Sequence, residues 1–247
     1  MGSDLLPQLN AAERKTDNAN IRPKDAATLL ILRRQNAGEP KVLMGRRHER
    51  HRFMPGKFVF PGGRVDPSDS RVALSGSFDP TVHQKLMYRM KQPRSEARAR
   101  ALAIAAIRET YEEAGLFIGK STGKHWKAPS PMQPFAERGI ELDLSPVRLI
   151  ARAITPPRRP RRFDTRFLAV FEDTIADSLP EKTGPSGELE DLHWIALDDA
   201  HRLELPSITM TIIEELRQRL SADPDLSPNT PVPYYYWQRK GFVREEI

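Results

Sequence analysis

Two apolar runs near the start of the chain predict a pair of β-strands. They cover residues 26–34 (AATLLILRR) and 41–47 (KVLMGRR). Gly38 and Pro40 lie between them and are typical of a turn. We therefore expect a β-hairpin, followed by a short third strand at 57–60 that leads into a Pro-Gly-Gly sequence.

The clearest helical pattern covers residues 96–113. This segment is rich in Ala, Arg, Leu and Glu, which are good helix formers, and Gly115 stands where a helix commonly ends. Weaker helical patterns cover 206–220 and 81–91. Three further apolar segments are typical of strands: 146–154, 163–171 and 189–197.

Strands, one central helix, more strands and a late helix predict an α/β fold. Helices on both faces of a mixed β-sheet would form an α/β/α sandwich, which we expect over residues 26–220. Residues 1–25 are polar and predict a flexible N-terminal arm, and residues 221–247 predict a tail rich in Pro and aromatic residues. Residues 64–95 carry several Pro and Gly residues and follow no single pattern.

The composition excludes several classes of site. The chain has 247 residues and no Cys, which excludes disulfides, thiolate metal ligands and Cys nucleophiles. Its longest apolar run, residues 101–107, is far shorter than a membrane span, and its first residues lack a secretory signal. We therefore expect a cytoplasmic protein without a membrane partner.

The positive charge favours anionic ligands without selecting one. The net charge is +6, which suits nucleotides, phosphates or nucleic acid, but also simple solubility. Residues 158–162 (RRPRR) form a basic run that can clamp phosphates, lie in solvent, or, as the least favoured interpretation, bind nucleic acid. The six His residues show no zinc-hydrolase spacing, and no P-loop sequence is present.

Three glutamates gather near the end of the expected central helix. Glu109 lies three residues before Glu112 and four before Glu113, so a helix places them on one face. Their repulsion, and the helix macrodipole, each cost a few tenths to about 1 kcal/mol. A divalent cation would offset this cost, because Mg²⁺ binds carboxylates together with waters and substrate phosphates. A solvated acidic face is the alternative, and the spacing alone does not decide.

The wider sequence resembles the Nudix box. Its family form is Gly, five residues, Glu, seven residues, then Arg-Glu-apolar-x-Glu-Glu-x-Gly-apolar. Residues 108–116 (RETYEEAGL) match the second half, with Thr110 in an apolar position. Gly63 resembles the opening glycine, but Arg108 follows 45 residues later instead of fourteen, so about 31 residues are inserted. Counted back from Arg108, the early glutamate falls at Arg100, and we expect it to be missing or relocated.

The inserted box resembles the NUDT-nineteen-like branch of the Nudix hydrolases. The matching stretches are residues 53–66, 106–109, 154–156 and 161–167. This resemblance implies the Nudix α/β/α sandwich, with an inserted segment at about 64–95 between the glycine loop and the catalytic helix. It also implies hydrolysis of coenzyme A (CoA) or acyl-CoA at the diphosphate linkage, with Mg²⁺ or Mn²⁺ as the cofactor.

The resemblance implies roles for individual residues. The implied metal ligands are Glu109, Glu112, Glu113 and the carbonyl oxygen of Gly63. Arg108 would hold the catalytic glutamates, Glu109 and Glu112, in place by charge-assisted hydrogen bonds. Glu188 is a candidate general base, with a solvated loop acid as the alternative. The residues assigned to substrate binding are Arg46, Arg161, Arg162 and Arg166.

The function expected from these residues is a metal-dependent diphosphatase. CoA or acyl-CoA is the preferred substrate, and NADH, ADP-ribose or another dinucleotide is an alternative. A non-catalytic regulator that binds a ligand or RNA is the rival function. The basic run and the absent early glutamate favour the rival, whereas the intact Arg-Glu-x-x-Glu-Glu sequence opposes it. We therefore expect a small nucleotide-diphosphate partner rather than nucleic acid, and leave a homodimer open.

Overall fold

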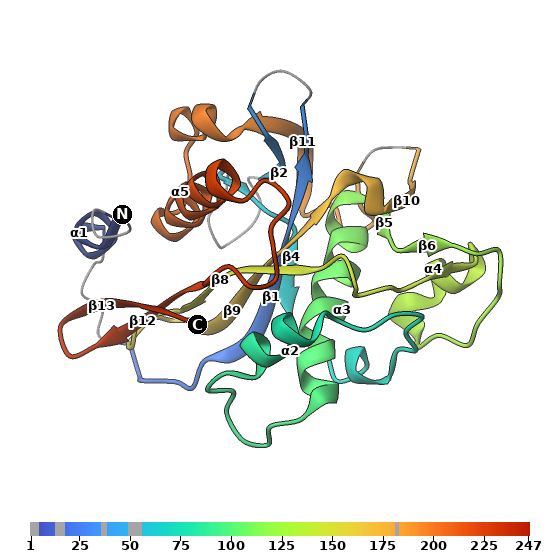
Figure 1. The fold of residues 1–247 in the computed structure, drawn as a ribbon, viewed down its shortest axis with the longest axis horizontal. Coiled ribbons are helices and arrows are strands. Elements are labelled where there is room, and N and C mark those ends of the chain that lie inside the picture. Colours follow the sequence, from blue (N-terminus) through green and yellow to red (C-terminus); the bar gives the residue numbers. More distant parts are fainter. Residues whose placement is uncertain (1–4, 13–17, 36–38, 49–55, 181–182) are drawn as a thin grey trace.

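A mixed β-sheet runs through the centre of the protein, and helices cover both of its faces (Figure 1). The computed structural model describes residues 5–12, 18–35, 39–48, 56–180 and 183–247. The strand order is β11-β2-β1-β9-β8-β12-β13, with β3 paired to β2 and β4 paired to β1. This arrangement confirms the predicted α/β class with a mixed sheet.

The central strands match the apolar runs of the sequence. β1 (Lys24–Arg33) and β2 (Lys41–Arg47) form the expected antiparallel hairpin. β1 also pairs in parallel with β9 (Phe163–Phe171), and β9 pairs antiparallel with β8 (Arg148–Ile154). The other strands of this sheet are β3 (Phe58–Val59), β4 (Gly62–Arg64), β11 (Leu189–Ala196), β12 (Pro233–Gln238) and β13 (Gly241–Glu246).

Short elements complete the chain between these strands. Two small sheets pair β5 (Leu116–Ile118) with β10 (Ile175–Ser178), and β6 (Lys120–Ser121) with β7 (Ile140–Glu141). The short helices are η2 (Asp69–Arg71), η3 (Ser130–Met132), α4 (Gln133–Glu137), η4 (Glu172–Thr174) and η5 (Leu197–Arg202). Among the described residues, no helix combines the length and apolar character needed to cross a bilayer.

The long helix α3 (Glu96–Ala114) packs against one face of the sheet (Figure 1). The Ser95 side chain accepts a hydrogen bond from the backbone N–H of Arg98, which caps the first turn. Gly115 ends the helix with a φ of 68°, a left-handed conformation that glycine adopts easily. The helix buries small and apolar side chains along its middle, so its acidic C-terminal end is held rigidly against the sheet.

The segment between the glycine loop and α3 is packed into the same core. It contains η2 and α2 (Pro80–Met87), whose first turn is capped by Asp79. Val72, Phe78, Val82 and Leu86 are buried in the core cluster that includes α3. Residues 64–95 therefore form part of the support of the helix.

Helix α5 (Ser207–Ala222) covers the other face of the sheet, together with α1 (Leu5–Ala11) (Figure 1). Leu9 is only 1% exposed and belongs to the core on this side. The expected flexible arm is therefore wrong for residues 5–11, because burial of an apolar face stabilises a helix there. Residues 1–4 and 13–17 of that expected arm lie outside the described residues.

The expected aromatic tail belongs to the sheet. β12 pairs in parallel with β8 and antiparallel with β13. Tyr235 is fully buried, and its hydroxyl donates a hydrogen bond to Glu215 of α5. The boundary expected at residue 221 is therefore wrong, because these aromatic side chains complete the core under α5.

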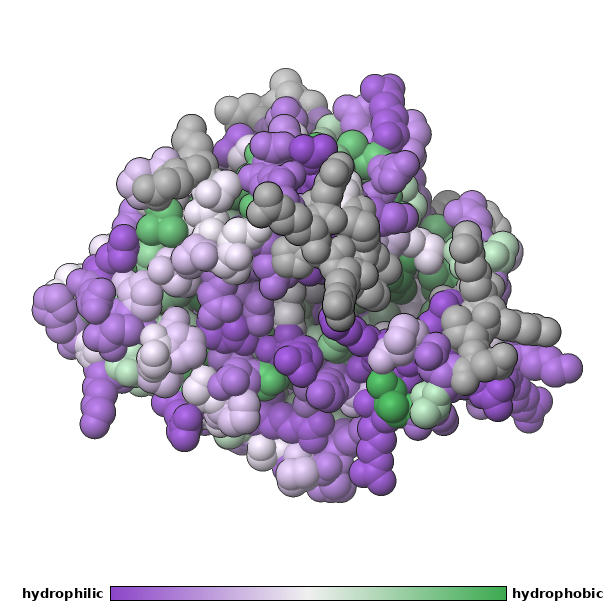
Figure 2. Space-filling view, turned by 180° about the vertical axis from the view of Figure 1, so that it is seen from behind, coloured by the Kyte–Doolittle hydropathy of each residue, from purple (hydrophilic) through white to green (hydrophobic). Residues whose placement is uncertain are grey.

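Hydrophilic residues cover most of the face seen in Figure 2, and hydrophobic residues form only small separate patches there. Ile21, at 41% exposure, is the exposed large hydrophobic residue in the described part of the chain. Apolar side chains are therefore concentrated in the two cores and in the cavity described next.

Candidate active site

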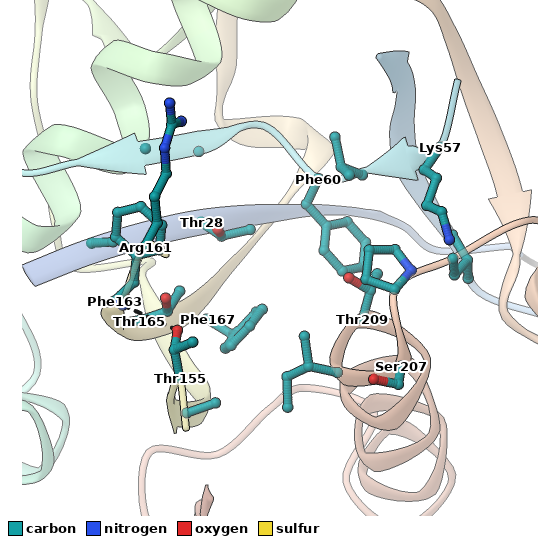
Figure 3. A pocket seen from close by; sticks show the side chains of 18 of the residues that line it. Thr28, Lys57, Phe60, Thr155, Arg161, Phe163, Thr165, Phe167, Ser207 and Thr209 are labelled. Atoms are coloured by element: carbon teal, nitrogen blue, oxygen red, sulfur yellow. Dashed lines mark hydrogen bonds between the residues drawn. The ribbon is translucent and has the colours of Figure 1, made fainter. Parts of the chain in front are cut away.

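A cavity of about 990 Å³ lies between the sheet, α1 and the start of α5. Figure 3 shows Arg161 and Phe163 on one side of it and Lys57, Ser207 and Thr209 on the other. Its apolar lining comes from distant parts of the chain and includes Leu9, Phe60, Ile154, Phe163, Phe167, Leu205, Ile208 and Phe242. The volume lies in the range of pockets that bury cofactor-sized ligands.

The acidic part of the cavity is formed by α3 and the glycine loop. Glu109 and Glu113 line the cavity together with Gly62 and Gly63 of β4. The backbone N–H of Gly62 donates a hydrogen bond to Glu113 Oε2 at 3.0 Å. A Cβ atom at Gly63 would lie 2.4 Å from Glu109 Oε1, so a larger residue there would displace this carboxylate.

Arg108 joins the glycine loop to the glutamates of α3. Its Nη1 donates to Glu109 Oε1 at 2.8 Å and to Glu112 Oε2 at 3.1 Å, and its Nη2 donates to the carbonyl oxygen of Arg64 at 3.0 Å. Arg108 is 6% exposed. Burial lowers the pKa of Arg108, but hydrogen bonds and charges from Asp69 and Glu109 outweigh it and raise the pKa above its ordinary value. The guanidinium therefore stays charged and holds both carboxylates.

The sequence interpretation missed Asp69. This residue is 1% exposed, and both of its carboxylate oxygens accept hydrogen bonds from Arg108, at 3.0 and 3.3 Å. Counting forward from Gly63 through the five residues 64–68 arrives at Asp69, which is the position of the early box glutamate. The count back from Arg108 to Arg100 led to the wrong residue, because the acid that contacts Arg108 is Asp69, 39 positions earlier in the sequence.

The carboxylates of the cavity repel one another. Burial raises the pKa of Glu113 to about 8, and the charges of Glu109 and Glu188 act in the same direction, against the hydrogen bond from Gly62. Burial also raises the pKa of Glu109, although Arg108 acts in the opposite direction. The positive partners of these two carboxylates therefore do not offset the cost of burying their charged forms.

The residues present fit a divalent cation with an open coordination sphere. Among the described residues, no group of three or more His, Cys, Asp or Glu side chains is placed so that it could hold a metal ion by itself. Glu109 and Glu113 instead supply carboxylate oxygens at a cavity wall, beside the glycine backbone. One or two carboxylates plus waters and substrate phosphates are the usual set for Mg²⁺.

Glu188 lines the cavity, whereas Glu112 does not. Glu112 bonds to Arg108 and does not belong to the cavity lining, so the structure does not bring all three glutamates to the cavity. Glu188 does line the cavity, and Arg47 donates a hydrogen bond to its Oε2 at 2.8 Å. A loop carboxylate held by an arginine opposite the helix suits a residue that orients water.

The four arginines expected to bind substrate are not together. Only Arg161 lines the cavity. Arg46 pairs with Glu190 and Asp191, at 3.5 and 3.3 Å, away from the cavity lining. The assignment of Arg46 is corrected to Arg47, because neighbouring residues of a strand point to opposite faces.

Arg162 and Arg166 serve the fold. Arg162 donates hydrogen bonds to Asn20 Oδ1 and to the carbonyl oxygen of Ile21, which fasten the N-terminal segment. Arg166 is 1% exposed and pairs with Asp164 at 2.9 Å. Neither residue lines the cavity, and both assignments to substrate binding are corrected. Further basic residues of the lining, which the sequence interpretation missed, are Arg47, Lys57, Arg64 and Arg159.

Comparisons with known proteins give one curated relative. No protein-family model matches the chain. The Caenorhabditis elegans protein named "Putative nudix hydrolase 7" is 28% identical over 167 residues, which cover 63% of this chain and 46% of that protein. The chain thus spans about half the length of this relative.

Solved structures resemble the fold. A NUDIX hydrolase from Alicyclobacillus acidocaldarius aligns with a TM-score of 0.58 and 26% identity, over 80% of this chain and 92% of that one. The Nudix hydrolase RenU from M. smegmatis covers 81% of this chain and 88% of that one, at 16% identity and a TM-score of 0.43. The chain is therefore similar in sequence to a curated Nudix hydrolase, and its fold is that of the Nudix hydrolase structures.

Proposed function

We propose that this protein is a metal-dependent hydrolase that cleaves the diphosphate linkage of a nucleoside diphosphate derivative. The observation that carries the proposal is the pair of carboxylates, Glu109 and Glu113, which face a cavity beside Gly62 and Gly63 without neutralising partners for all of their charge. In the reaction, water adds to one phosphorus and the bond from that phosphorus to the bridging oxygen breaks, which leaves two phosphate monoesters.

Some residues of the site would bind the cation, and others orient the residues that bind it. A divalent cation, Mg²⁺ or Mn²⁺, when bound, neutralises phosphate charge and lowers the pKa of water. Glu109, Glu113 and the carbonyl oxygen of Gly63 would hold it. Arg108 keeps Glu109 in place, and Glu112 shares that arginine.

Glu188 would accept the proton of the attacking water. It lies in the cavity wall and is hydrogen-bonded by Arg47. The same arginine lines the cavity, so its guanidinium would contact a phosphate oxygen of the substrate. A base needs hydrogen-bond reach to the water, which the position of Glu188 in the same cavity supports.

The lining supports a substrate that has a charged middle and an apolar part. Arg47, Lys57, Arg64 and Arg161 add positive charge to the lining. The apolar lining between α1 and α5 would take a hydrocarbon or pantetheine-like arm. CoA or acyl-CoA combines these features and is the preferred substrate, and NADH, ADP-ribose and other dinucleotides are the alternatives.

A substrate screen tests the function. CoA, an acyl-CoA, NADH, ADP-ribose and diadenosine polyphosphates are incubated with the protein and Mg²⁺ or Mn²⁺, and products are identified by mass. We expect cleavage of a CoA substrate that stops with EDTA and falls on the order of 10²-fold in Glu109→Gln. Glu172→Gln is the matched control, because Glu172 pairs with Arg33 and does not line the cavity.

The rival function is a non-catalytic regulator that binds a ligand or RNA. The basic lining residues keep it as a second candidate. Salt-sensitive RNA binding, together with no hydrolysis of any compound in the screen, would favour it over the hydrolase.

A further inference from the structure

The cavity extends from its acidic end across most of the central sheet. β4, which holds Gly62 and Gly63 beside the glutamates, pairs with β1, and β9, β8, β12 and β13 follow in that order (Figure 1). Phe242 of β13 also lines the cavity. Neighbouring strands lie about 4.8 Å apart, so the five steps from β4 to β13 cover about 24 Å across the sheet. A diphosphate bound near the glutamates would therefore occupy only one end of the cavity.

The lining becomes apolar along this path. Thr28 of β1 and Thr165 of β9 still place hydroxyl groups on the cavity wall (Figure 3). Among the described residues, β8 then adds Ala153 and Ile154, and β13 adds Phe242, and these side chains are all apolar. A polar group of a ligand would lose its water there without gaining a hydrogen bond from these side chains, which costs free energy. A hydrocarbon chain has no such cost and gains free energy from leaving water.

Helix α1 closes the apolar end of the cavity. Leu9 of this helix and Ala12, which follows it, line the cavity, and Leu9 is 1% exposed. Asn10 Oδ1 accepts a hydrogen bond from the backbone N–H of Phe242 at 2.8 Å, which fastens the helix to β13. α1 has seven residues, and a helix this short is not stable on its own in water. Its position therefore depends on packing, and a chain in the cavity would add to the contacts of Leu9.

We propose that α1 and β13 form a hydrocarbon-binding end of the cavity, which makes the protein selective for a diphosphate substrate that carries a straight acyl chain over the same compound without one. The selectivity rests on the proposed function, whereas binding of the chain does not. Because Leu9 belongs both to the cavity wall and to the core beneath α5, a bound chain and the docked helix stabilise each other. Both segments lie outside residues 26–220, to which the sequence patterns assigned the fold.

Binding of the chain is tested without hydrolysis. Dodecanoic acid with a terminal bromine is added to the protein in EDTA, below the concentration at which micelles form. Tryptophan fluorescence is recorded, because bromine quenches a tryptophan that it approaches closely. Trp237 packs edge-on against Phe242 with ring centroids 5.4 Å apart, whereas Trp126 and Trp194 pack against the core on the α3 side. We expect quenching in the wild type that is largely lost in Trp237→Phe, and equal quenching in both would overturn the proposal.

Two leucines of α1 separate a role in the cavity wall from the docking of the helix. Leu9 lines the cavity, whereas Leu6 packs against the same core without lining it. Leu9→Gln should weaken binding of the brominated acid about tenfold, because a polar side chain replaces part of the apolar wall, and Leu6→Gln should weaken it by no more than about threefold. Equal weakening in the two variants would show that Leu9 acts only through the stability of the helix, and would overturn its place in the site.

A filling variant remains informative if Leu9→Gln does not fold. Ala11 and Ala12 are both exposed, and of the two only Ala12 lines the cavity. Ala12→Phe leaves Leu9 in place and narrows the apolar end. It should lower the ratio of kcat/KM for dodecanoyl-CoA over CoA about tenfold, and the ratio for butanoyl-CoA over CoA less. Ala11→Phe is the matched control and should leave both ratios within about twofold of the wild type.

The wild-type kinetics separate this proposal from the proposed function. The ratio of kcat/KM for dodecanoyl-CoA over CoA should be about tenfold or more, and a ratio of one or less, or a preference for NADH or ADP-ribose, would overturn the selectivity. If no diphosphate is cleaved but the quenching depends on Trp237 and Leu9, the proposed function fails and the hydrocarbon site stands. Cleavage of CoA compounds without such quenching supports the proposed function and overturns the hydrocarbon site.

Discussion

Two clusters of buried charge, one on β8 and β9 and one at the end of α3, differ in the balance of acidic and basic side chains. In the first, Arg152 and Arg166 surround Asp164, with contacts of 2.8 and 2.9 Å and side chains no more than 3% exposed. The hydrogen bond from Arg152 and the charges of both arginines hold the pKa of Asp164 below its usual value, although burial alone would raise it. This cluster closes on itself and serves the fold.

The second cluster is the acidic end of the cavity. Burial there raises the pKa of Glu113 to about 8, and one arginine, Arg108, serves Asp69, Glu109 and Glu112. The same side-chain types therefore produce opposite shifts of carboxylate pKa. The number of arginine partners accounts for the opposite pKa shifts. At the acidic end of the cavity the carboxylates outnumber the arginines, whereas in the cluster on β8 and β9 two arginines surround one carboxylate. A site left short of positive charge is one that can accept a cation.

The largest effect should follow from breaking the balanced cluster. Asp164→Asn leaves two buried guanidiniums without their central carboxylate and should lower the free energy of unfolding by about 3–5 kcal/mol. Urea unfolding measures this loss. Because the folded pKa of Asp164 lies below its unfolded value of about 3.9, its contribution is present above that pH and is lost as the pH falls through the folded pKa.

Asp177→Asn is the control for this substitution, because the side chain of Asp177 is 48% exposed in its pair with Arg138. Its loss should be at most about 1 kcal/mol. Equal losses of unfolding free energy in Asp164→Asn and Asp177→Asn would show that the buried cluster contributes no more to stability than an exposed ion pair.

The next effect concerns activity and not stability. Glu113→Gln removes a carboxylate that lacks compensating charge, so kcat should fall on the order of 10²–10³-fold while the free energy of unfolding stays equal or rises. Steady-state kinetics and urea unfolding are measured on the same preparation. A large loss of stability in Glu113→Gln would show that this carboxylate supports the fold as Asp164 does.

The smallest effect should come from the basic lining. Arg161→Ala should raise KM about 2–10-fold with kcat nearly unchanged, because an exposed arginine contributes modestly to phosphate binding. Arg46→Ala is the matched control, since Arg46 contacts Glu190 and Asp191 outside the cavity. A larger rise of KM in Arg46→Ala than in Arg161→Ala would contradict this placement of the substrate.

Local patterns were sufficient for much of the fold. The strands at β2 and β9 and the start of α3 were predicted at the residues where they occur. Their patterns are local, because side-chain periodicity and end residues such as Gly115 act within a few positions. The N-terminal helix and the β12–β13 pair were missed, because contacts with α5 and β8, distant in sequence, stabilise them.

The sequence by itself determined the acidic helix end, its Arg-Glu-x-x-Glu-Glu spacing and the glycine that must lie near it. Only the tertiary structure decided which carboxylates face the cavity, that Arg47 lines it where Arg46 does not, and that Arg166 is buried. It also brought Asp69 into contact with Arg108, which lies 39 positions later in the sequence. Spacing along a helix defines which residues share a face, but the direction of that face, and the partner for each charge, depend on packing between segments far apart in the chain.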